Sequence, residues 1–140
     1  METTVRPGSP AQRGTVQEWH VLQRALPATP VAARLARMTA RVACRAWRVP
    51  AAEEPAALVV SELVTTVLRR TETTTLSLRV LMTPRRLRLE VHDPSGRLPE
   101  DLGAPGTDDV DALAVVAATA VRWGAERRAA GAQLWAEIAL

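Results

Sequence analysis

The stretch that decides the fold reads LVVSELVTTVLRR and spans residues 58–70. Its apolar residues recur at the three- and four-residue spacing of an amphipathic helix. The apolar stripe of this helix consists of Val59, Val60, Leu63, Val64 and Val67. Glu62, Thr66 and Arg69 lie at i, i+4 and i+7, so we expect them to share one polar face. Two interpretations of that face stay open: a solvated surface, or a nucleotide cleft in which Glu62 takes a proton or orients water.

The pattern of the whole chain predicts a two-layer α/β (α+β) sandwich. Helical periodicity, strand alternation and Pro- or Gly-rich breaks place the elements in the order β-α-α-β-β-α-β. We expect a strand at 16–26, helices at 30–47 and 53–70, strands at 76–82 and 87–91, a helix at 108–122 and a last strand at 133–140. This order predicts a mixed, mainly antiparallel sheet with helices on one face. The composition of residues 1–15, with little apolar surface to bury, predicts a disordered tail. It precedes a single domain at 16–140.

The helix at 30–47 has large apolar residues on one side and arginines on the other. We expect its buried stripe to consist of Val31, Leu35, Met38, Val42 and Ala46. The arginines that we expect to face solvent are Arg34, Arg37, Arg41 and Arg45.

Composition excludes several classes of function. The formal net charge is only +3, although the pI is near 10.8, because all 18 basic residues are arginine. These arginines are scattered along the chain, so we expect no nucleic-acid binding. One cysteine and two histidines do not support a zinc site. The chain has no signal-peptide pattern and no long apolar run, so we expect a cytoplasmic protein that does not cross a membrane.

Four segments together resemble the bacterial anti-sigma regulatory factors, the small serine-kinase branch of the histidine-kinase-like (GHKL) ATPases. Members of that family typically show Ser-Glu-Leu-Val-Thr-Asn-Ala-Val-Arg-His on one helix, and this chain reads SELVTTVLRR at 61–70. The family continues with an Asp-Pro-Ser-like turn, an Arg-Trp-Gly motif and a Trp-containing last strand. Here these are DPSG at 93–96, RWG at 122–124 and LWAE at 134–137. The similarity covers about residues 16–140 and implies the histidine-kinase-like ATPase (Bergerat) fold.

The resemblance also implies a set of site residues. Glu62 matches the general base, and Asp93 matches the aspartate that accepts a hydrogen bond from the adenine amino group. Thr66 stands at the position of the asparagine that holds Mg²⁺. The residues that the resemblance places in the nucleotide-binding region are Asp93, Thr66, Arg69, Gly96 and Leu113. An alternative for Asp93 is that Asp-Pro-Ser-Gly only makes a good turn.

The chain departs from the family at the phosphate and metal half of the site. Thr66 replaces the asparagine, and its hydroxyl is too short to reach the same point. The family's Gly-Arg-Gly-Leu becomes VDAL at 110–113, which replaces two glycines and adds the carboxylate of Asp111. GAQ at 131–133 replaces a Gly-Lys-Thr-like element and loses another cation. Glycines let backbone N–H groups approach phosphates, and a carboxylate repels them, so these changes indicate weak or lost ATP binding.

The resemblance therefore implies a regulatory protein that acts by protein–protein binding in a partner-switching system. Its implied partners are a sigma factor or an anti-sigma-factor antagonist, and relatives often form homodimers through the sheet and the first helix. The alternative is an active ATP-dependent serine protein kinase that phosphorylates the antagonist. In that case Glu62 is the base, Thr66 is a tolerated metal ligand, and ATP and Mg²⁺ are the cofactors.

Overall fold

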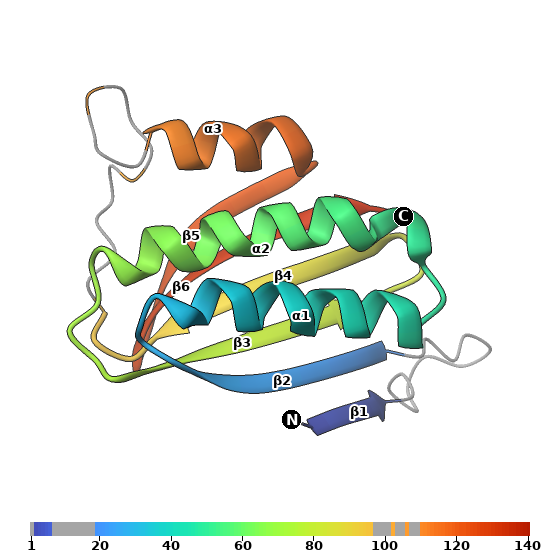
Figure 1. The fold of residues 1–140 in the computed structure, drawn as a ribbon, viewed down its shortest axis with the longest axis horizontal. Coiled ribbons are helices and arrows are strands. Elements are labelled where there is room, and N and C mark those ends of the chain that lie inside the picture. Colours follow the sequence, from blue (N-terminus) through green and yellow to red (C-terminus); the bar gives the residue numbers. More distant parts are fainter. Residues whose placement is uncertain (1, 7–18, 97–101, 103–105, 107–109) are drawn as a thin grey trace.

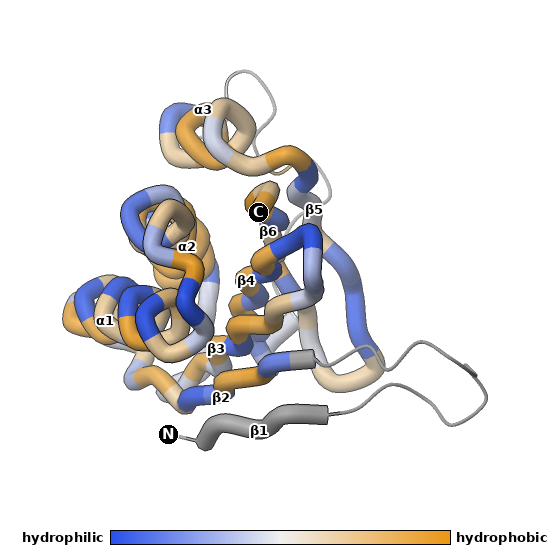
Figure 2. Tube along the Cα trace, turned by 90° about the vertical axis from the view of Figure 1, so that its right-hand side faces the viewer, coloured by the Kyte–Doolittle hydropathy of each residue, from blue (hydrophilic) through white to orange (hydrophobic). Residues whose placement is uncertain are grey.

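The computed structural model describes residues 2–6, 19–96, 102, 106 and 110–140. Six strands in this part of the chain form one sheet, in the order β1-β2-β3-β4-β6-β5. The elements are β1 (Glu2–Arg6), β2 (Trp19–Pro27), α1 (Val31–Ala46), the 3-10 turn η1 (Pro50–Ala52), α2 (Glu53–Leu68), β3 (Thr75–Met82), β4 (Arg86–Asp93), α3 (Val110–Thr119), β5 (Arg122–Arg128) and β6 (Gly131–Ala139). Helices α1 and α2 lie over one face of the sheet, and α3 lies beside α2 (Figures 1 and 2). The predicted two-layer α+β arrangement is confirmed.

The sheet is antiparallel at every pair of neighbouring strands that the structure describes, so the prediction of a mixed sheet is wrong for this part of the chain. The difference comes from β5, which the sequence pattern did not predict. Strand β5 follows α3 and turns back into β6, and β6 is the strand that pairs with β4. This extra strand reverses the chain before β6, which makes the β4–β6 pair antiparallel.

The core lies between α2 and the inner face of the sheet. The predicted apolar stripe of α2 is confirmed, since all five of its side chains are fully buried: Val59, Val60, Leu63, Val64 and Val67. They pack with alternate residues of the central strands, which include Leu78, Val80, Leu89, Val91 and Leu134. Burial alternates along most of β3, as the period-two pattern of its apolar residues predicts.

Helix α1 buries a different face from the predicted one. Val31, Met38 and Val42 are 43%, 50% and 44% exposed. The buried face is instead made of small residues: Ala32, Ala36, Thr39, Ala40, Ala43 and Cys44. Small side chains let α1 approach its neighbours closely, so shape rather than side-chain hydrophobicity selects the buried face.

Three arginines of α1 contact α2, and the Arg45 side chain stays 72% exposed, as predicted. Arg37 donates from Nη1 to the Ser61 Oγ over 2.9 Å. Arg41 and Arg45 form ion pairs with Glu54 and Glu53 at the start of α2. These contacts orient α1 along α2. Of the predicted stripe, Leu35 is partly buried and packs against the core, while Val31, Met38 and Val42 stay exposed.

Two strands lie where none was predicted. In β5, most residues are exposed and no apolar alternation exists, so the sequence carried no strand signal. Strand β1, Glu2–Arg6, pairs with β2 inside the segment that the sequence predicted to be a disordered tail. The described residues do not include residues 1 and 7–15 of that tail, residues 16–18 of the predicted first strand, or most of the predicted loop after Gly96. Among the described helices, none is both long and apolar enough for a membrane crossing.

Candidate functional site

The candidate site is a cavity between α2 and the first turns of α3. Its volume is about 330 Å³. Among the described residues, α2 contributes Glu62 and Arg69 to its lining, and α3 contributes Asp111, Ala112 and Val115. The structure therefore brings together the predicted base, the predicted polar partner two turns later and the acidic residue of the altered glycine motif.

Thr66 is not among the described residues that line this cavity. Its side chain is fully buried, and its Oγ1 has no hydrogen-bond partner among the residues that the structure describes. The reason is helical geometry: Thr66 comes seven residues after Val59, which puts both on nearly the same side of α2. The expectation that Glu62, Thr66 and Arg69 share one polar face is therefore wrong for Thr66. Its proposed role at a metal site stays a prediction.

Asp93 ends β4 and is fully buried. Its Oδ1 accepts three hydrogen bonds, from the Thr71 Oγ1 at 2.9 Å, the Ser95 amide at 2.8 Å and the Ser95 Oγ at 2.7 Å. Its Oδ2 is buried and accepts no hydrogen bond from the described residues. The bonds to Oδ1 fit a turn-forming role, whereas the unpaired Oδ2 could accept a hydrogen bond from a ligand amino group.

Glycines shape the turn beside Asp93. The Gly96 amide donates to the Asp93 carbonyl over 3.2 Å, and the φ of Gly96 is +69°, in the left-handed region that favours glycine. Gly131 begins β6 with a φ of +120°, and a Cβ there would lie 2.2 Å from the Asp93 carbonyl oxygen. The sequence indicated Gly131 only as part of a lost phosphate element. The structure gives it a second role, since it lets β6 pass close to the Asp93 turn.

Leu113 is 2% exposed and belongs to the hydrophobic core. Its side chain packs α3 onto the domain. Leu113 is not among the described residues that line the cavity. Asp93 and Gly96 are also outside that lining. The structure therefore joins two of the six sequence-predicted site residues in one cavity, namely Glu62 and Arg69.

The charge of the cavity wall is negative. Glu62 and Asp111 supply two carboxylates and Arg69 supplies one guanidinium, so the described lining has a net charge of −1 (+1 − 2). Asp111 is exposed, so water and salt screen its charge more than the sequence alone suggested. Across the described residues, no three His, Cys, Asp or Glu side chains gather into a group that could hold a metal ion.

Comparison of the chain with protein-family models and with curated proteins finds no match.

Proposed function

We propose that this chain is an anti-sigma-factor-like regulatory protein that acts by protein–protein binding, with weak or lost ATP binding. It would work in the cytoplasm within a partner-switching system, on a sigma factor or an anti-sigma-factor antagonist. The resemblance described under Sequence analysis supplies this hypothesis, together with the Bergerat form of the α+β sandwich.

One observation supports the loss of ATP binding above the others. Asp111 lines the same cavity as Glu62, at the start of α3, where the resemblance expects a glycine-rich phosphate contact. A polyphosphate in this cavity would meet two carboxylates and a helix start that carries Val110 and Ala112 instead of glycines. Each unfavourable charge pair at about 4 Å costs about 1 kcal/mol in water, and more where water is displaced.

The surface of α1 supports the protein-binding part of the proposal. Val31, Met38 and Val42 recur along the helix and are all more than 40% exposed. A helix that leaves its largest apolar side chains in water has a surface suited to a protein partner or a second copy of the chain.

The second candidate function is an active serine protein kinase, and Asp93 favours it. A buried carboxylate with one unpaired oxygen is costly unless something donates to it, and an adenine amino group would do so. Glu62 in the cavity wall would then serve as the base. Adenine recognition can survive the loss of the phosphate half, so this observation does not by itself require catalysis.

Thermal denaturation with two ligands separates the candidates. We expect millimolar Mg-ATP to leave the melting temperature nearly unchanged. A ligand at about 100 times its Kd would stabilise the protein by roughly 2.7 kcal/mol. For a domain of this size that is a shift of about 9 °C, and such a shift with Mg-ATP would favour the kinase.

Binding of ATP and of adenosine to the Asp111→Asn variant shows whether Asp111 acts on the phosphate half of the site or on the adenine half. If phosphate repulsion is the cause, the substitution should tighten ATP binding about fivefold and leave adenosine binding unchanged. Equal effects on both ligands, or none on ATP, would contradict the assignment of Asp111.

A bacterial two-hybrid screen against the sigma factors and antagonists of the same genome tests the partner class directly, and a screen with no interaction would count against it.

A further inference from the structure

The face of the sheet that points away from α1 and α2 carries a second polar site. Along β3 and β4, residues such as Leu78 and Val91 point into the core, so their neighbours point outward. The strand register places Ser77 opposite His92, and His92 opposite Gln133, in one row across three strands. Polar side chains from separate parts of the sequence thus meet on this outer face.

A pocket of about 270 Å³ lies over this row. Its described lining comes from all five strands β2 to β6: Gln23, Ser77, Arg79, His92, Arg128 and Gln133. We call it the outer-face pocket. Every lining side chain among the described residues is polar, and none of these is a carboxylate.

Two buried N–H donors at this pocket have no partner among the described residues. Gln133 is only 5% exposed, yet its Nε2 makes no hydrogen bond there. The Nε of Arg79 is also buried and unpaired, while its Nη1 lies 3.4 Å from Glu90. An unpaired buried donor is costly, and each of these two donors belongs to a side chain that lines the pocket.

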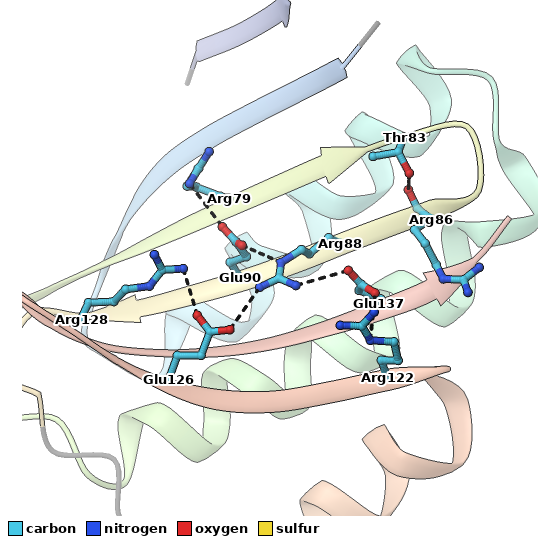
Figure 3. Close-up of polar contacts among 9 residues, drawn as sticks. All are labelled: Arg79, Thr83, Arg86, Arg88, Glu90, Arg122, Glu126, Arg128 and Glu137. Atoms are coloured by element: carbon cyan, nitrogen blue, oxygen red, sulfur yellow. Dashed lines mark hydrogen bonds and ion pairs between the residues drawn. The ribbon is translucent and has the colours of Figure 1, made fainter. Parts of the chain in front are cut away.

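The surrounding charges favour an anion as that acceptor. Figure 3 shows a network in which Glu90, Glu126 and Glu137 are paired with arginines. Its arginines are Arg79, Arg88, Arg122 and Arg128, so the network has a net charge of +1 (+4 − 3). Glu126 holds the Arg128 guanidinium at 3.1 Å beside the pocket.

The network also holds the pocket wall in place. Glu90 is 6% exposed and contacts Arg79 on one side and Arg88, at 2.7 Å, on the other. The Arg88 guanidinium stacks 4.1 Å from the centre of the Trp135 ring. Side chains already fixed by such contacts lose little conformational entropy when a ligand binds.

We propose that the outer-face pocket binds a small molecule that carries an oxyanion, either a carboxylate or a phosphate. Gln133 Nε2 and Arg79 Nε donate hydrogen bonds to the oxyanion, and Arg128 supplies charge at the rim. This site lies on the opposite face of the sheet from the helices and does not depend on the proposed regulatory function.

Titration by NMR at constant ionic strength tests the site in the unaltered protein. Inorganic phosphate and citrate serve as probes, with chloride as the background anion. The two histidines provide a matched pair, since His92 lines the pocket while His20 packs against Trp47 at 5.4 Å. We expect saturable shifts of the His92 imidazole signals with at least one probe and none for His20. Absence of saturation with both probes, or equal shifts of both histidines, would overturn the proposal.

Two variants locate the contacts. Gln133→Met keeps the length of the side chain and removes the donor, and Arg128→Ala removes the rim charge. Each should weaken binding of the responding probe at least tenfold. The control is Arg86→Ala on β4, since Arg86 hydrogen-bonds the Arg85 carbonyl and is outside the described pocket lining. Unchanged affinity in Gln133→Met, or equal loss in all three variants, would show that the anion is not held in this pocket.

Discussion

Thr66 occupies the sequence position of a predicted site residue, but its side chain does not line the candidate cavity. It stands where the resemblance expects a metal ligand, yet its hydroxyl is buried on the apolar side of α2 without a hydrogen-bond partner among the described residues. A buried hydroxyl that makes no hydrogen bond lowers stability, because it loses its bonds to water on folding.

We therefore expect Thr66→Val to raise the free energy of unfolding by about 1 kcal/mol. The matched control is Thr39→Val on α1, also buried, whose Oγ1 donates to the Leu35 carbonyl at 2.8 Å and accepts from Arg24 at 3.2 Å. The free energy of unfolding of that control variant should fall by about 1–2 kcal/mol. Urea denaturation of both variants checks the difference. A similar loss at both positions would mean that the Thr66 hydroxyl is satisfied in the folded protein.

Helix α1 is the element whose outward face carries the proposed binding surface. Its small residues pack inward, three of its arginines contact α2, and Val31, Met38 and Val42 remain exposed. The residues that pack α1 onto the domain are therefore different from the exposed residues that we propose for binding. Changes on the outward face should affect partners far more than folding.

The double variant Met38→Glu/Val42→Glu should abolish binding to the partner or to a second copy of the chain. Because both side chains are exposed, we expect the free energy of unfolding to change by only about 0.5 kcal/mol. Leu58→Glu is the control, since Leu58 is 45% exposed but lies on α2. Size-exclusion chromatography and two-hybrid signals provide the measurement. Loss of binding in the Leu58 control as well would point away from α1 as the interface.

Across the whole molecule, the titration behaviour above pH 8.5 is unusually simple. The chain contains no lysine and no tyrosine, and arginine loses its proton only at much higher pH. The single cysteine is therefore the one side chain that titrates between about pH 8.5 and 11.5. Burial, and next the nearby Glu53 carboxylate, raise the pKa of the Cys44 thiol from 9.0 to about 11.

The raised pKa predicts a loss of stability at alkaline pH. Below pH 9 both states keep the thiol protonated, so stability does not depend on this group. Between pH 9 and 11 the unfolded chain loses the proton while the folded protein keeps it, so stability falls by up to about 1.4 kcal/mol per pH unit. Urea denaturation from pH 8 to 11.5 measures this slope, and Cys44→Ala should remove it. A flat profile in the unaltered protein, or the same slope in the variant, would contradict the prediction.

Local patterns were enough for most elements of the fold. The helices at Val31–Ala46 and Glu53–Leu68, the hairpin of β3 and β4 and the last strand all follow from their periodicity and from Pro or Gly breaks. They also placed Glu62 and Arg69 on one side of α2, where the structure finds both in one cavity. These predictions depend on contacts within a few residues, for which side-chain spacing is sufficient information.

The sequence by itself determined the helix and hairpin core of the molecule and one polar pair of the candidate cavity. Only the tertiary structure decided that β5 enters the sheet, that α1 buries its alanines, that Thr66 turns inward and that six separate residues form the outer-face pocket. Strand β5 carries no apolar alternation, and the buried face of α1 depends on how closely a neighbour can approach. Such choices arise from packing between distant segments, which the local spacing of residues does not encode.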